Sequence, residues 1–167
     1  MADLPFFDLP APPAQANGVG VLIRFVDALG FRFRWATEGL RESDGAFKPC
    51  ATALSLFELV KHINNLAGHA AWALDAPMPP GGPAPVTLDD YRHRTLAQLL
   101  FLREQLQRKS DAGLLACKIG EHPFWNILNG PLADALTHVG QLNTYRRAAG
   151  NPGPKGVGYL SGKGPAA

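Results

Sequence analysis

The sequence predicts an all-α protein: a four-helix bundle with a proline- and glycine-rich crossover loop and irregular termini. Three observations lead to this fold class. Apolar residues recur at three- and four-residue steps in four stretches, which is the period of an amphipathic helix. Proline and glycine gather between and outside these stretches, where they end helices. No run of more than a few residues alternates apolar and polar positions as a half-buried strand does, and 167 residues suit one domain over 1–167.

The first half of the chain is predicted to hold an extended arm and two helices. Residues 1–16 are rich in proline and alanine, which favours an extended arm over a core element. The first helix is expected from Asn17, a good N-cap residue, to about Gly39. The second, from Thr52 to Leu74, is the clearest and has a wide apolar face.

The second half is predicted to hold two more helices separated by loops. In chain order we expect a crossover loop over 77–83, a helix over 87–108, and an ambiguous 109–122 with a short turn at 114–117. The last main helix is expected to begin near Pro131, or a little earlier, and to run to Ala149, and a loop-like tail follows over 153–167. Asp90, three residues after Thr87, makes a weak variant of a capping box at the start of the third helix. Gly150, followed by Pro152, ends the last one.

Composition and charge exclude several classes of function. A net charge of +2 with scattered basic residues is too small for a nucleic-acid-binding surface, and Arg24, Arg32 and Arg34 are expected on a solvated helix face. The sequence has no secretory signal and no uncharged apolar run of the ~18 residues that span a bilayer. Cys50 and Cys117 are isolated thiols, typical of a reducing compartment, so we expect a cytoplasmic protein with no membrane partner.

The last predicted helix and the residues before it are unusually poor in charge. Between Phe124 and Tyr145 the only formally charged residue is Asp134. A helix face in water normally carries Lys and Glu, so we expect this helix to be enclosed on most sides. The overall composition, 46% hydrophobic and 18% charged, also favours a large shared surface such as a dimer interface.

A divalent-metal site is the main functional prediction. Asp134 and His138 are four residues apart and therefore share one helix face, a spacing that can bind one ion. His62, at the edge of the apolar face of the second helix, is the leading candidate for a third ligand. Imidazole and carboxylate suit Zn, Ni, Fe or Mn, and three protein ligands leave positions for a water or a substrate.

Other interpretations stand beside this one. Asp and His four apart often form only a hydrogen bond or a surface pair, and the line from Asp134 to Tyr145 lies off the centre of its helix's apolar stripe. The candidates for supporting roles are Glu58, His69, Gln141, Tyr145 and Trp72, of which Gln141 is expected to hydrogen-bond a metal-bound water or substrate. Cys50 is a candidate reactive thiol near the site.

The segments Leu59-Val60-Lys61-His62-Ile63 and Asp134-Ala135-Leu136-Thr137-His138-Val139-Gly140-Gln141 resemble the DinB-like (YfiT-like) superfamily of metal-binding four-helix bundles. So do 34–40 and 145–152, and the resemblance covers roughly 18–152. It implies that His62 and His138 are metal ligands. Asp134 departs from the family pattern, which has a histidine there.

The resemblance also implies a homodimer and, in some relatives, an enzyme that uses a low-molecular-weight thiol; nothing in the sequence supports binding to DNA. Two functions follow as hypotheses. The first is a metal-dependent thiol S-transferase or hydrolase. The second is a non-catalytic homodimeric metal-binding or scaffold protein, in which Asp134 and His138 are an interface feature.

Overall fold

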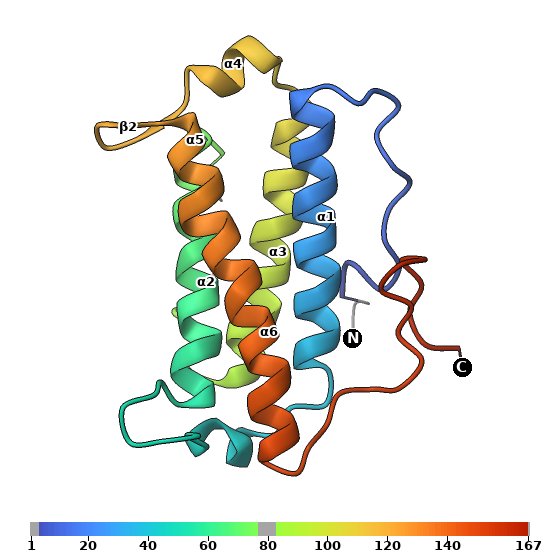
Figure 1. Ribbon diagram of the computed structural model, residues 1–167, viewed down its shortest axis with the longest axis vertical. Helices are drawn as coiled ribbons and strands as arrows, with labels where there is room; N and C mark the ends of the chain where they lie inside the picture. Colours follow the sequence, from blue (N-terminus) through green and yellow to red (C-terminus); the bar gives the residue numbers. More distant parts are fainter. Residues whose placement is uncertain (1–3, 77–82, 167) are drawn as a thin grey trace.

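The computed structural model describes residues 4–76 and 83–166, and this part of the chain is mostly helical. Four long helices lie lengthwise beside one another (Figure 1): α1 (Gly18–Thr37), α2 (Leu56–Ala73), α3 (Leu88–Leu106) and α6 (Ala133–Ala148). α2 packs against α3 and α6, and α1 packs against the same two helices. The prediction of an all-α protein is confirmed, while the predicted crossover loop lies almost wholly outside the described residues.

Short elements connect the long helices. They are η1, a 3-10 turn (Glu42–Ala46), α4 (Asp111–Leu115), β1 (Lys118–Ile119), β2 (His122–Pro123), α5 (Phe124–Ile127) and η2, a π-helical turn (Leu128–Leu132). α4 and the antiparallel β1–β2 hairpin lie at one end of the long helices (Figure 1). The hairpin was not predicted, and the turn predicted at 114–117 lies earlier, in α4, because the Ser110 side chain accepts a hydrogen bond from Gly113 N and caps this helix.

Side-chain caps decide where the long helices begin. Asn17 accepts a hydrogen bond from Gly20 N, so α1 begins where it was predicted. α2 begins four residues later than Thr52, because Ser55 and Glu58 form a reciprocal capping box there. The capping box predicted for Thr87 and Asp90 is confirmed at the start of α3.

The last helix begins earlier than Pro131 and is kinked. The chain is helical from α5 through η2 into α6, and the non-helical backbone of Gly130 (φ −84°, ψ −111°) lies beside Pro131. Proline removes a backbone donor and crowds the preceding turn, which accounts for the kink. Gly150, with a φ of +77°, takes the left-handed conformation beyond the end of α6, as the sequence predicted.

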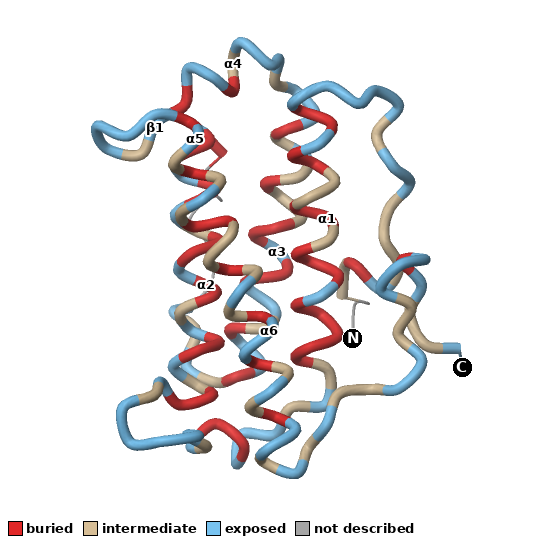
Figure 2. The backbone as a smooth tube through the Cα atoms, in the orientation of Figure 1, coloured by how far each residue is buried: buried red, intermediate tan, exposed pale blue. Residues whose placement is uncertain are grey.

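Figure 2 shows buried residues along all four long helices, and the buried residues include the charged Asp27 and Arg34 of α1 and Arg146 of α6. Arg146, 1% exposed, donates to the backbone oxygens of Ala36 and Glu38 at 2.9 Å and of Asn151 at 2.8 Å. A guanidinium thus satisfies carbonyls left open at the C-terminal end of α1. The Arg146 guanidinium of α6 therefore has a structural role.

The N-terminal arm and the C-terminal tail have no helix in their described parts, as predicted, and they pack on each other. Leu9 N donates to Gly162 O at 2.8 Å, and Lys163 Nζ lies 2.8 Å from a carboxylate oxygen of Asp8. Phe6 is buried against α1. The two ends of the described chain therefore form one irregular layer on α1.

The prediction that Arg24, Arg32 and Arg34 form a solvated helix face holds for Arg32, which is exposed, but is wrong for the buried Arg34, and Arg24 is half-buried. Arg24 donates to Pro10 O at 3.0 Å, and the buried Arg34 donates to the backbone oxygens of Leu4 and Pro5. The Arg32 guanidinium lies 5.0 Å from the centre of the Tyr159 ring in the tail. The carbonyls of an arm without secondary structure need donors, and Arg24 and Arg34 supply them. Along the described helices, none is both long and apolar enough to cross a bilayer.

Candidate metal centre

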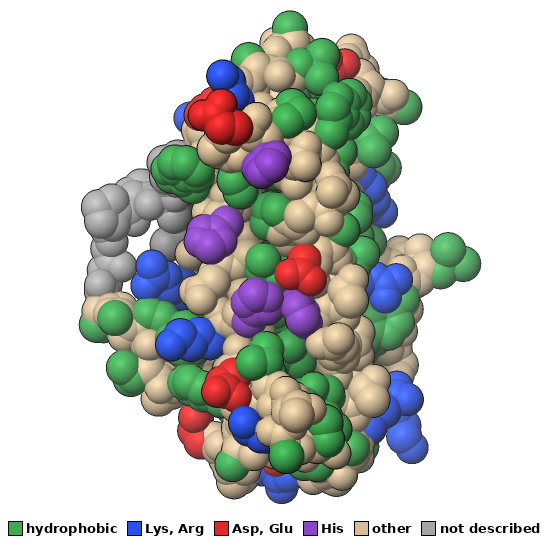
Figure 3. Space-filling view, turned by 60° about the vertical axis from the view of Figure 1, so that its left-hand side comes forward, with side chains coloured by type: hydrophobic (Ala, Val, Ile, Leu, Met, Phe, Trp, Pro, Cys, Tyr) green, Lys and Arg blue, Asp and Glu red, His purple; other side chains and the backbone are tan. Residues whose placement is uncertain are grey.

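Three side chains from two helices meet on one face of the molecule. His62 of α2 points toward Asp134 and His138 of α6, and the three ligand atoms they offer all lie within 4.8 Å of one another. His62 Nε2 is 3.5 Å from Asp134 Oδ2, and His138 Nε2 is 3.3 Å from Asp134 Oδ1. Figure 3 shows histidine side chains gathered on this face with an acidic side chain beside them. The carboxylate therefore presents one oxygen to each imidazole.

The helix registers explain this meeting. Each of the three residues directly precedes a buried one: Ile63, Ala135 and Val139. Because α2 packs against α6, side chains at the edges of their buried faces meet at the seam between the helices. A π-helical turn holds more residues than an α-helical turn, so η2 changes the rotation of the helix that follows it. This rotation determines which face of α6 lies against α2.

The seam is open to solvent. The side chains of His62 and Asp134 are 39% and 45% exposed, and that of His138 is 17% exposed. α6 buries Ala135, Val139, Leu142 and Arg146, and much of its remaining surface is accessible. The expectation that this helix is enclosed on most sides is therefore wrong for the described chain by itself. The carboxylate avoids the cost of burial because it stays hydrated.

The two imidazole–carboxylate distances are longer than those of direct charge-assisted hydrogen bonds. Charge-assisted N–O hydrogen bonds are about 2.7–2.9 Å long, and both imidazole–carboxylate distances exceed that length. At metal–ligand distances of about 2.0–2.1 Å, ligand atoms around one ion lie roughly 3.0–3.4 Å apart. The two imidazole–carboxylate distances are close to this range and the donor types suit a divalent ion, so the group could hold one.

Gln141 orients one of the imidazoles. Its Oε1 lies 2.8 Å from His138 Nδ1, and since a carboxamide oxygen only accepts, Nδ1 carries the hydrogen. The lone pair of Nε2 then faces Asp134, as a metal ligand requires. Gln141 was predicted to hydrogen-bond a metal-bound water or substrate, whereas its hydrogen bond here is with His138.

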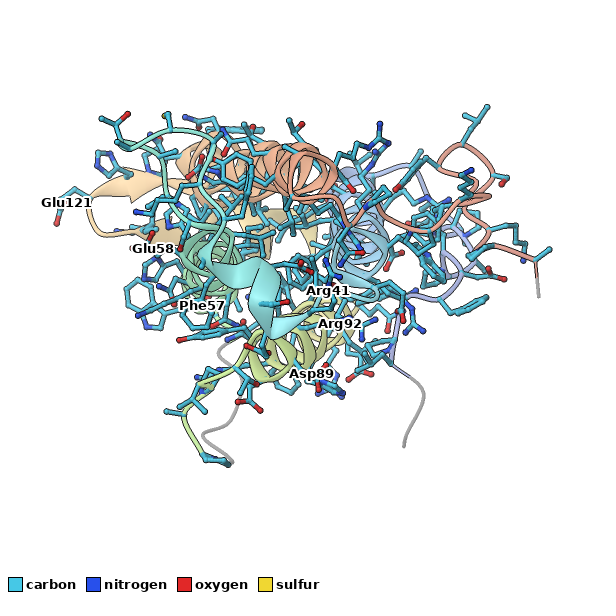
Figure 4. The ribbon with its side chains drawn as sticks, turned by 90° about the horizontal axis from the view of Figure 1, so that it is seen from below. Arg41, Phe57, Glu58, Asp89, Arg92 and Glu121 are labelled. Atoms are coloured by element: carbon cyan, nitrogen blue, oxygen red, sulfur yellow. The ribbon has the colours of Figure 1, made fainter. Side chains whose placement is uncertain are left out.

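Glu58 and His69 do not join the cluster. Glu58 accepts from Ser55 N at 2.7 Å in the capping box and lies 3.6 Å from Lys48 Nζ, so it does not orient His62. Figure 4 shows Glu58 at the edge of α2 in the view along the helices. His69 is exposed, two turns after His62, and is not part of the group that could hold an ion.

Tyr145, Trp72 and Cys50 also have other surroundings. The Tyr145 ring packs edge-on against Phe47, with ring centres 6.1 Å apart, and Trp72 is 60% exposed on α2. Cys50 is exposed in the loop before α2, where a hydrogen bond with the Thr52 side chain holds the pKa of its thiol below the ordinary value. Cys117, in contrast, is buried, and burial raises the pKa of its thiol.

An apolar groove that the sequence analysis did not identify lies between α1, α4 and α5. It holds about 590 Å³, and its lining includes Val21, Phe25, Leu115, Trp125 and Leu128. Val21, Leu115 and Trp125 are more than half exposed beside it. The absence of charge between Phe124 and Ala133 was the available signal.

Comparison with known proteins adds no relative. No family of known sequences, no curated protein and no solved structure gives a significant match to this chain. The resemblance to the DinB-like superfamily therefore rests on the residues around His62 and His138 and on the segments that flank them.

Proposed function

We propose that the chain is a divalent-metal-dependent enzyme of the DinB-like superfamily, built as a four-helix bundle, with His62, Asp134 and His138 as the metal ligands. The observation that carries the proposal is the meeting of two imidazoles and one carboxylate from α2 and α6, with their ligand atoms within 4.8 Å of one another. The donor set suits Zn, Ni, Fe or Mn. A bound ion of this kind lowers the pKa of a thiol or water that it holds, which supplies a nucleophile at neutral pH.

The chain's own residues have separate roles in this proposal. Gln141 fixes the tautomer of His138, so that its Nε2 is available as a ligand. The exposed sides of His62 and Asp134 leave room for a substrate beside the cluster. We propose thiol S-transfer or hydrolysis as the reaction, because both need only an activated nucleophile held next to an electrophile.

Metal analysis of the purified, reloaded protein tests the proposal. We expect about one divalent ion per chain, retained in His93→Ala and lost in His138→Ala. His93 is the matched control because it also lies four residues after an aspartate, with its Nδ1 3.3 Å from Asp89 Oδ2. A wild-type protein that stays metal-free on loading with Zn or Ni would contradict the proposal. Binding of small thiols to the metal-loaded protein would favour S-transfer. Metal-loaded protein that does not bind small thiols would favour hydrolysis.

We also propose that the chain forms a homodimer through the groove between α1, α4 and α5. Trp125, 61% exposed, borders this groove together with Val21 and Leu115, and an apolar surface of this kind is typical of an interface. A dimer through this groove is compatible with the proposed enzyme and equally with the alternative function, a non-catalytic homodimeric scaffold. The metal analysis distinguishes these two functions.

Light scattering coupled to gel filtration tests the dimer. We expect the mass of two chains for the wild type and of one chain for Trp125→Lys. Trp72→Lys is the matched control, because Trp72 has nearly the same exposure, 60%, and is not among the residues that line the groove. A wild-type mass of one chain, or an equal response of the two variants, would refute this assignment.

A further inference from the structure

The third member of the cluster is a carboxylate, and this changes the chemistry that the site favours. We infer that Asp134 is the specificity-determining ligand. It shifts the site toward harder, six-coordinate ions such as Mn(II) or Fe(II), and toward one bidentate, singly charged oxygen ligand such as a 2-hydroxy carboxylate. This inference rests on the proposed metal site and deepens it.

The first step concerns the donors. Oxygen ligands suit Mn(II), imidazoles suit Zn, Ni and Fe, and two histidines with one carboxylate on one side of an ion form the set that holds Fe(II) with adjacent positions open. A site with three imidazoles lacks the hard donor. Asp134 therefore raises the affinity for Mn(II) and Fe(II) relative to Ni and Zn, compared with a histidine at the same position.

The second step concerns coordination number. Among the described residues, no fourth His, Cys, Asp or Glu joins the cluster. The nearest candidates along the chain are already engaged: Glu58 with Ser55, and Gln141 with His138. The side chains of His62 and Asp134 are more than a third exposed. Three protein ligands on one side and water on the other leave adjacent positions free, whereas a structural zinc site is closed by a fourth protein ligand.

The third step concerns charge. Two neutral imidazoles and one carboxylate leave a divalent ion with a single net positive charge. No other formally charged residue lies between Phe124 and Tyr145 to offset it. On α2 the charges of Glu58 and Lys61, each within about a turn of His62, are opposite in sign. One anion completes the charge balance, and a ligand with a carboxylate and a neighbouring hydroxyl oxygen can occupy two adjacent positions. A three-imidazole site would retain two positive charges and lose this match.

Asp134→His tests the inference, with His93→Ala as the control for an unrelated histidine. Titration calorimetry with Mn(II) and Zn(II) should show the ratio of Mn(II) to Zn(II) affinity falling about tenfold or more in Asp134→His, the scale on which ligand surroundings change metal affinity. Co(II) provides a spectroscopic readout independent of activity. Its visible absorption should be weak, as for six-coordination, in the wild type, and intense, as for four-coordination, in Asp134→His. Circular dichroism checks that the variant keeps its helices.

Glycolate and acetate separate bidentate from monodentate binding at equal charge. Glycolate should change the electron paramagnetic resonance spectrum of the Mn(II)-loaded wild type at concentrations where acetate does not. An intense Co(II) spectrum in the wild type, an unchanged metal ratio in Asp134→His, or equal effects of glycolate and acetate would overturn the inference and leave the metal site standing. A wild type that binds none of these ions would overturn the proposed function itself.

Discussion

Two aspartate–histidine pairs with the same spacing occur in this chain, and their surroundings differ. Asp134 and His138 lie on α6, and Asp89 and His93 lie on α3; in each pair an imidazole nitrogen is 3.3 Å from a carboxylate oxygen. On α3 the facing nitrogen is Nδ1, which also donates to Asp89 O at 2.9 Å. On α6 the facing nitrogen is Nε2, because Nδ1 is bound to Gln141.

The second difference is the neighbouring helix. α2 brings His62 to the α6 pair, while no third His, Cys, Asp or Glu among the described residues joins the α3 pair. Figure 4 shows Asp89 on α3, on the opposite side of the molecule from α6. Spacing along one helix therefore predicts a pair, and only packing against another helix, together with the orientation of the ring, makes a candidate metal site.

The largest effect is expected from removing the third ligand. In His62→Ala the α6 pair, like the α3 pair, consists of one aspartate and one histidine without a third ligand. We expect its Zn affinity to fall by more than about 100-fold, because loss of an outer partner alone costs about 10–100-fold. Titration calorimetry measures this, and His69→Ala, on the same helix, should match the wild type. Equal affinities for His62→Ala and the wild type would remove the distinction between the two pairs.

A smaller effect is expected from releasing the ring orientation. Gln141→Leu removes the acceptor for His138 Nδ1, so the ring can turn, and Zn affinity should fall by about 10–100-fold. Gln141→Glu keeps an acceptor oxygen at the same place and should retain most of the affinity. Wild-type affinity in Gln141→Leu would mean that the hydrogen bond has no orienting role.

Without metal, the two pairs should be alike. Exposed ion pairs contribute about 0–1 kcal/mol, and the carboxylates of Asp134 and Asp89 are 45% and 68% exposed. Asp134→Asn and Asp89→Asn should therefore each change the free energy of unfolding by less than about 1 kcal/mol. Urea denaturation in the presence of a chelator measures both. A much larger loss in Asp134→Asn would mean that the α6 pair is needed for the fold.

A pH-dependent effect concerns Asp90, the carboxylate that has a structural role on α3. Hydrogen bonds from Val86 N and from the Thr87 side chain and backbone lower the pKa of Asp90. A carboxylate with a lowered pKa stabilises the fold above its ordinary pKa and loses that contribution as the pH falls through the lowered value. Asp90→Asn should lower the Tm at neutral pH more than Asp89→Asn does, and the difference should shrink at acid pH. A constant difference would contradict the assignment.

The helices followed from the sequence because their signals are local. The apolar periods of α1, α2 and α3, and the Thr87–Asp90 box, each depend on residues within a few turns. The start of α2 was misplaced because the Ser55–Glu58 box was not identified. The β1–β2 hairpin has two-residue strands, too short for any alternating pattern.

The candidate site was predictable in part. The pairing of Asp134 with His138 followed from spacing, and the position of His62 beside them matches the expectation. The role of Gln141 depends on which nitrogen of His138 it reaches, and the positions of Arg24 and Arg34 depend on an arm distant in sequence. Such contacts depend on how elements distant in sequence pack together, and the spacing of residues along the chain does not predict that packing. The exposure of α6 was missed because a helix with few charged residues was taken to be a buried one.

Nitrogen-15 NMR of the histidine rings during a Zn titration tests the central claim most directly. If His62, Asp134 and His138 hold one ion, the Nε2 resonances of His62 and His138 shift together and stop shifting at one equivalent. His138 Nδ1 stays protonated, and both nitrogens of His93 stay unchanged. Equal shifts at His93, or a lack of change at His62 and His138, would contradict a metal centre at the seam of α2 and α6.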